Sequence, residues 1–100
     1  LDKPDEAAAV LDACLRYDGY RGVRFMLDFH PTRPELCQTD RGDYMTDPAF
    51  LDGVKLLGAR GLLFELQVCQ VQLAEAAAFA TACPDVSMVL NHAGFPLRGE

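Results

Sequence analysis

Hydrophobic and polar positions alternate along the chain between residues 22 and 30. Val23 and Phe25 fall on one side of an extended backbone there, whereas Arg24 and Asp28 fall on the other. This period of two predicts a strand over residues 22–30. Two later runs are short and largely apolar, and they predict two further strands, at residues 62–68 and 86–90.

Between these runs, apolar residues recur every three or four positions, which is the period of an amphipathic helix. Three helices are predicted, at residues 4–17, 48–60 and 71–83. The second has the clearest boundaries, because Asp47 can cap it, Pro48 suits its first turn and Gly61 suits the position after its end. For the first helix, Asp2 is the cap candidate. The spacing predicts an apolar stripe on the third helix, formed by Leu73, Ala76, Ala77 and Ala80.

The alternation of helices and strands predicts an α/β fold in which three parallel strands are joined by right-handed helical crossovers. In such sheets, ligands bind outside the carboxyl ends of the strands. Those ends fall at His30, at residues 67–69 and at residues 91–92. Residues 31–46 form a connection longer than the usual length of about four to six residues, and an active-site lid and a disordered segment are its two interpretations.

Length and composition narrow the class of protein. A chain of 100 residues, of which 50% are hydrophobic, is enough for one globular domain. Its formal charge of -6 opposes binding to nucleic acid and to anionic membranes. No apolar run reaches the roughly 20 residues that span a membrane, and no basic and apolar leader opens the chain, so a soluble protein is expected.

The four cysteines form no CxxC pair and have no histidine at zinc-finger spacing, which disfavours a structural zinc site. Three of them lie in apolar segments, where a free thiol behaves as a small hydrophobic group. We therefore expect reduced thiols and a cytoplasmic protein.

Three polar residues stand out because of their positions in the predicted sheet. His92 follows the third strand directly, where an imidazole suits a metal ligand, a general base or a hydrogen bond to the adjacent turn. Arg24 and Gln67 lie inside apolar strands and need partners if they are buried. Arg24 can bind a substrate carboxylate through two parallel hydrogen bonds, or it can form a structural ion pair with Glu65 or Asp28.

Four blocks of sequence, by their order and spacing, resemble the middle of an amidohydrolase-related hydrolase. The blocks are GVRF at 22–25, TDPAFLDG at 46–53, FELQV at 64–68 and VLNHAGFP at 89–96. Within that superfamily, the chain is similar to the subgroup that contains the sugar lactonases and 2-pyrone-4,6-dicarboxylate lactonase. The resemblance implies that residues 1–100 are part of a (β/α)8 TIM-barrel hydrolase domain, with the three strands as its fourth, fifth and sixth.

The resemblance also implies roles for individual residues. In such enzymes the histidine of the last block is an active-site group near the scissile carbonyl, and a ligand where a divalent metal such as zinc is used; this role falls on His92. The arginine of the first block resembles one that binds a substrate carboxylate, which makes Arg24 a substrate-binding candidate together with Gln67. Metal-dependent relatives have His where this chain has Gln67, and Asp is common where it has Asn91, so zinc-dependent and metal-free mechanisms both stay open.

The expected function is hydrolysis of a small carboxylated lactone. The family's His-x-His pair and its eighth-strand Asp have no counterpart here, and a full barrel needs about 250 residues, so we expect an internal part of a longer hydrolase, inactive by itself. The expected partners are the small-molecule substrate and further copies of the chain. The alternatives are an amidohydrolase-type decarboxylase and a stand-alone, non-enzymatic α/β binding domain, such as a receiver with Asp28 as phosphoacceptor. The receiver is disfavoured, because the strand ends lack its acidic pair and its Lys.

Overall fold

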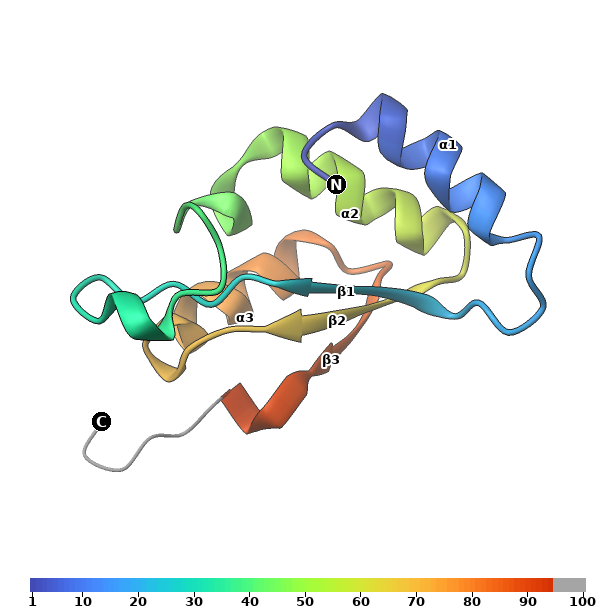
Figure 1. The fold of residues 1–100 in the computed structure, drawn as a ribbon. Helices are drawn as coiled ribbons and strands as arrows, with labels where there is room; N and C mark the ends of the chain where they lie inside the picture. The colour runs from blue at the N-terminus through green and yellow to red at the C-terminus, as the bar shows by residue number, and fades with distance from the viewer. Residues whose placement is uncertain (95–100) are drawn as a thin grey trace.

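The computed structural model describes residues 1–94 and contains a three-stranded sheet in which both strand pairs are parallel (Figure 1). The strand order is β1-β2-β3, which confirms the predicted α/β fold. Phe95 and Pro96, at the end of the fourth sequence block, lie outside the described residues. The strands and α-helices are β1 (Gly22–Met26), β2 (Leu63–Gln67), β3 (Ser87–Leu90), α1 (Pro4–Cys14), α2 (Pro48–Ala59) and α3 (Leu73–Ala82).

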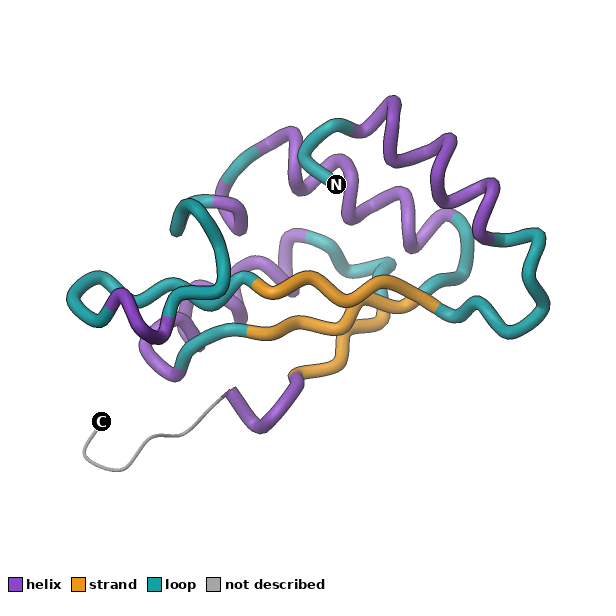
Figure 2. Tube along the Cα trace, viewed as in Figure 1, coloured by secondary structure: helices purple, strands orange, loops and turns teal. Residues whose placement is uncertain are grey.

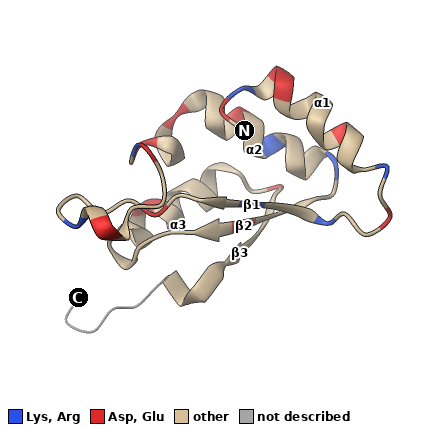
Figure 3. Cartoon of the chain, in the orientation of Figure 1, with Lys and Arg blue, Asp and Glu red and all other residues tan. Residues whose placement is uncertain are grey.

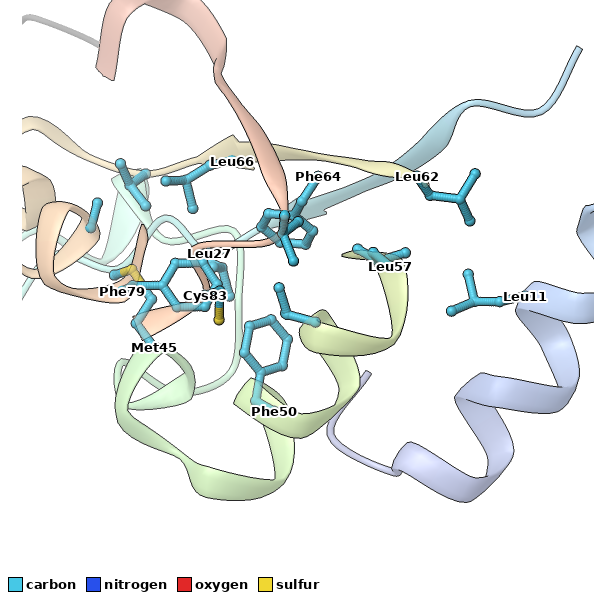
Figure 4. Packing of buried hydrophobic residues seen from close by; sticks show 14 residues of the cluster. Leu11, Leu27, Met45, Phe50, Leu57, Leu62, Phe64, Leu66, Phe79 and Cys83 are labelled. Atoms are coloured by element: carbon cyan, nitrogen blue, oxygen red, sulfur yellow. The ribbon is translucent and has the colours of Figure 1, made fainter. Parts of the chain in front are cut away.

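The hydrophobic core lies between the sheet and the helices, and of these α2 and α3 connect the strands (Figure 2). Three phenylalanine rings from three elements meet in this core: Phe50 of α2, Phe64 of β2 and Phe79 of α3 (Figure 4). Their ring centroids lie 5.9 to 6.3 Å apart. Each such pair adds about 0.5–1.5 kcal/mol beyond the area it buries, so the cluster fixes both helices to the central strand.

The opposite face of the sheet is open in the described chain. Met26 and Val89 lie there, and 47% and 45% of their surfaces are exposed. Most charged positions lie on the helices and loops (Figure 3), and the strands contain only Arg24 and Glu65, both on this open face. A sheet with helices on one side and a mixed polar and apolar surface on the other matches consecutive β/α units of a barrel, whose strands face the barrel interior on that side.

Helix α2 begins and ends where the sequence predicts. Asp47 caps it, because its Oδ1 accepts a hydrogen bond from the Ala49 amide at 2.9 Å. At the other end, Gly61 has a φ of 66°, and Leu62 N donates to the Leu57 carbonyl at 2.9 Å, as in a Schellman motif. A Cβ at Gly61 would meet no atom within 4 Å, so only the left-handed backbone favours glycine there.

Strand β1 is shorter than the strand predicted over residues 22–30. Its ladder to β2 continues for one bond beyond the strand, from Leu27 N to the Gln67 carbonyl at 2.8 Å. After that, the Gln72 side chain replaces a neighbouring strand: its Nε2 donates to the Leu27 carbonyl and its Oε1 accepts from Phe29 N, both at 3.0 Å. A side chain can satisfy the hydrogen-bonding groups of an extended backbone as well as a neighbouring strand does. The alternating sequence pattern therefore runs further than the strand itself.

Helix α1 is also shorter than predicted. It ends at Cys14 and not near Tyr17, and Lys3 occupies the cap position predicted for Asp2. The residues after its end have little core to cover, since Leu15 is 41% exposed and Tyr17 is 75% exposed. With little apolar area to bury, these residues form short turns instead of a further helical turn.

Helix α3 turns a different face to the sheet from the one predicted. It starts at Leu73, and its buried residues are Ala76 and Phe79, whereas Leu73 and Ala77 are exposed. The larger apolar area of Phe79 outweighs that of the small alanines and decides which face is buried. None of the described helices is both long and apolar enough to cross a membrane.

Residues 31–46 pack against the carboxyl end of β1. They contain two short 3-10 turns, at Pro34–Leu36 and Tyr44–Thr46. Gln38 N donates to the Asp28 carbonyl at 2.9 Å, and the Tyr44 ring lies 5.5 Å from the ring of Phe25. The segment is therefore attached to the sheet edge by hydrogen bonds and ring contacts, and its role as a lid stays a prediction.

Candidate functional site

The carboxyl ends of the three parallel strands lie along one edge of the sheet, which we call the carboxyl edge. Gln67 is the last residue of β2 and pairs with Met26 of β1. His92 lies in the Asn91–Gly94 turn that follows β3 directly. Arg24 lies further from the edge, in the middle of β1. The fold thus brings Gln67 and His92 to the edge and leaves Arg24 deeper on the open face.

His92 is exposed and has a strained backbone. Its φ and ψ are 52° and 31°, and those of Ala93 are 52° and 29°. Residues other than glycine adopt this left-handed conformation rarely, at a cost of about 1–3 kcal/mol each. Gly94 follows with a φ of 75°, so three consecutive residues are left-handed. Strain of this kind persists where the surrounding structure enforces it, and it concentrates at functional sites.

Arg24 forms an ion pair with Glu65, which is one of the two roles predicted from its position in the strand. Its Nε lies 2.6 Å from Oε2 of Glu65, on the neighbouring strand. The Arg24 hydrogen bond, with a smaller contribution from Asn91, lowers the pKa of Glu65 below its ordinary value. The Arg24 side chain is still 56% exposed. Since the pair uses Nε, binding of a carboxylate at Arg24 would use the two terminal nitrogens.

A cavity of about 380 Å³ lies beside Arg24, between β1 and residues 31–46. Met26, Asp40 and Tyr44 are among the residues that line it. A larger cavity of about 510 Å³ lies between α1 and β1, and its wall contains neither Arg24, Gln67 nor His92. Of these two cavities, the smaller is therefore the one lined both by a predicted binding residue, Arg24, and by residues of the 31–46 segment.

Two polar side chains are buried where β1 and β2 end. Gln67 is 7% exposed, and Asp28 is 3% exposed. Oδ1 of Asp28 has no hydrogen-bond partner among residues 1–94. Burial of a carboxylate oxygen without a partner is unfavourable, so the Asp28 carboxylate has an unused capacity to accept a hydrogen bond.

Gln72 was missed by the sequence analysis, although it holds two strand ends together. Besides its bonds to Leu27 and Phe29, its Oε1 accepts from Cys69 N at 2.8 Å. The side chain is buried, with 6% exposed surface. A sequence signal existed: Gln72 lies on the buried face of the third helical segment together with Ala76, Phe79 and Cys83.

The described residues do not form a metal site by themselves. No group of three or more His, Cys, Asp and Glu side chains within residues 1–94 is arranged to hold a metal ion. A divalent ion at the carboxyl edge would therefore need ligands besides His92.

Comparison with known proteins identifies the family. The amidohydrolase family model matches residues 1–99. The chain belongs to the amidohydrolase family. This amidohydrolase chain is 33% identical, over 104 aligned residues, to the uncharacterized protein y4mH of Sinorhizobium fredii (strain NBRC 101917 / NGR234). The alignment covers 97% of the chain and 32% of y4mH, so the chain spans about a third of that relative's length. No solved structure matches the chain.

Membership of this family confirms the coarser part of the resemblance, which is to the amidohydrolase-type family. The parallel sheet with helices on one face agrees with part of a barrel domain of this family. The roles predicted for His92, Arg24 and Gln67 remain predictions.

Proposed function

We propose that the protein hydrolyses the ester bond of a small carboxylated lactone. Water adds to the ring carbonyl, the bond between the carbonyl carbon and the ring oxygen breaks, and the product is an open-chain hydroxy acid. The observation that supports this most is the strained turn at His92, which lies at the carboxyl edge of the sheet in a chain of the amidohydrolase family.

Each candidate residue has a role in this reaction. His92 positions or polarises the lactone carbonyl. Arg24 binds the substrate carboxylate through its terminal nitrogens, while its bond to Glu65 fixes the guanidinium. Gln67 offers an amide to the bound ring. The attacking water is activated by a carboxylate or by a divalent metal held with further ligands, so both a metal-dependent and a metal-free mechanism remain candidates.

The experiment is a hydrolysis assay of the native protein, at its natural length, with a panel of lactones with and without a carboxylate. We expect turnover of carboxylated lactones to ring-opened hydroxy acids, identified by NMR. Release of carbon dioxide instead would identify a decarboxylase and contradict the proposal, as would the absence of turnover across the panel.

A matched pair of variants tests the substrate carboxylate. Arg24→Ala should raise KM for a carboxylated lactone about tenfold or more, because a charged hydrogen bond contributes about 1.5–3 kcal/mol. Arg33→Ala is the control, because Arg33 pairs with Glu35 on an exposed loop. Equal KM values for the two variants would contradict the role of Arg24.

A further inference from the structure

We infer that Arg41 is a positioning residue, which fixes the wall of the cavity beside Arg24 by holding the 31–46 segment in place. This cavity, of about 380 Å³, gives a ligand room next to Arg24. The inference rests on the proposed function, in which Arg24 binds the carboxylate of the lactone. It adds the residue that keeps this binding region in shape.

The guanidinium of Arg41 joins three parts of the chain. One terminal nitrogen lies 2.8 Å from Oδ1 of Asp43, in the same segment, and the other lies 2.7 Å from Oδ2 of Asp47, the cap of α2. Oδ2 of Asp2, just before α1, is 3.9 Å from the second nitrogen. A planar guanidinium can serve several carboxylates in a fixed geometry, and a network of charges contributes more than an isolated surface pair. Arg41 therefore attaches the segment to the starts of two helices.

Arg41 also holds the ring of Tyr44. Its Cζ lies 4.0 Å from the ring centroid, which is a cation–π contact. On the core side, the same ring packs against Phe25 of β1 and Phe50 of α2, with centroids 5.5 and 5.3 Å away. The Tyr44 hydroxyl therefore has a fixed position.

That hydroxyl connects Arg41 to the cavity wall. It donates to Oδ1 of Asp40 at 2.8 Å, and Oγ1 of Thr39 donates to the same oxygen at 3.3 Å. The Tyr44 hydrogen bond is the largest of the effects that hold the pKa of Asp40 below its ordinary value, so the accepting carboxylate is charged. Thr39, Asp40 and Tyr44 all line the cavity beside Arg24. One ring and one hydrogen bond thus link this wall to Arg41.

Hydrophobic burial does not hold this part of the segment. Residues 38–43 have the sequence QTDRGD, which contains no apolar side chain to bury. A backbone hydrogen bond from Gln38 N to the Asp28 carbonyl, at 2.9 Å, attaches its first residue to the end of β1. The position of the wall beyond that bond depends on the polar contacts centred on Arg41.

Arg41→Gln and Tyr44→Phe test the two links in this chain of contacts. Hydrogen exchange of the native-length protein, read by mass spectrometry, follows the amides of residues 38–47. These amides should exchange about tenfold or more faster in Arg41→Gln, because a polar segment without its attachment opens more often. Tyr44→Phe keeps the ring contacts and loses only the bond to Asp40, so its faster exchange should be confined to residues 38–41.

Each variant has a matched control. Arg60→Gln also removes an ion pair, since Nε of Arg60 lies 2.8 Å from Oδ1 of Asp12. Tyr17→Phe removes the hydroxyl of a tyrosine that is 75% exposed. Both controls should leave exchange in the 31–46 segment at the wild-type rate.

Kinetics separate a positioning role from a purely structural one. The two substrates are 5-oxotetrahydrofuran-2-carboxylate and γ-butyrolactone, which has the same ring without the carboxylate. Arg41→Gln and Tyr44→Phe should raise KM for the carboxylated lactone about fivefold or more and leave kcat within about twofold, because ground state and transition state lose the same binding. KM for γ-butyrolactone should change less than about twofold, because this lactone has no carboxylate to place at Arg24.

Wild-type exchange of residues 38–47 in Arg41→Gln would overturn the inference. Faster exchange with an unchanged KM would also overturn it, because the segment would then be held for stability alone. An equal rise in KM for both lactones, or a fall in kcat alone, would place the effect outside the cavity beside Arg24 and count against it in the same way.

Binding separates this inference from the proposed function. If the wild type hydrolyses neither lactone, the proposed function fails. Calorimetric titration with 2-hydroxyglutarate, the ring-opened form of the carboxylated lactone, still tests Arg41. Weaker binding by Arg41→Gln than by the wild type and Arg60→Gln supports the inference, whereas equal binding by all three, or no binding by the wild type, overturns it.

Discussion

The two ends of strand β2 are built in different ways. At its amino end, the turn from α2 is closed by backbone bonds around Gly61, and its donors and acceptors are paired with one another. At its carboxyl end, a buried glutamine side chain joins β1 to β2, and one carboxylate oxygen, Oδ1 of Asp28, has no partner in the described chain. The amino end is therefore closed by backbone groups alone, whereas the carboxyl end depends on the side chain of Gln72 and leaves one buried acceptor unpaired among residues 1–94.

The largest expected effect on stability comes from a substitution in the hydrophobic core, against which both ends of β2 pack. Phe64→Ala removes one of the three rings of the cluster, and this ring is fully buried. We expect the free energy of unfolding to fall by about 3–5 kcal/mol, because a cavity replaces the ring. Urea denaturation measures this free energy. A loss below about 1 kcal/mol would show that the helices do not depend on this cluster.

The amino end is tested by Gly61→Ala. The new methyl group meets no other atom, so only the left-handed backbone opposes it, at about 1–2 kcal/mol. Urea denaturation should show this loss, while the kcat/KM of the native-length variant for a carboxylated lactone stays within about twofold of the wild type. A large loss of activity in a folded variant would break the proposed division between the two ends.

The carboxyl end is tested by Ala93→Gly, which should raise stability where Gly61→Ala lowers it. Glycine adopts a φ of 52° without strain, so the variant should gain about 1 kcal/mol of stability. Its freer backbone should hold His92 less firmly and lower kcat. A gain in stability with no change in kcat would mean that the strain is not connected with function.

The smallest effect is the pH response of the Arg24–Glu65 pair. The pair holds the pKa of Glu65 below 4.5, its ordinary value, so its stabilisation is present above that pH. It is lost as the pH falls through the lowered value. We expect Glu65→Gln to reduce the loss of stability between neutral and acid pH by a small amount, because the pair is half exposed. An unchanged slope would show that the pair contributes nothing measurable.

The structure could be predicted from the sequence where local chemistry decides it. Asp47 and Pro48 act on the first turn of α2, and Gly61 acts on its last turn. Each end is closed by contacts over a few residues, so the boundaries of α2 could be predicted from the chain alone. The parallel sheet followed from the order of the elements.

Contacts between distant segments could not be predicted from the sequence. Gln72 binds backbone groups 43 and 45 positions away, and no local pattern specifies such contacts. The position of His92 after β3 could be predicted, but its left-handed backbone could not, because residues other than glycine seldom adopt it. The unpaired oxygen of Asp28 likewise depends on packing that only the folded chain defines.

We propose that the carboxyl edge of the sheet is the catalytic edge of the protein. The most direct test is the kcat/KM of His92→Ala in the native protein with a carboxylated lactone, together with its circular dichroism spectrum. We predict a loss of about 100- to 10,000-fold with an unchanged spectrum. Wild-type turnover by a folded His92→Ala variant would contradict the claim.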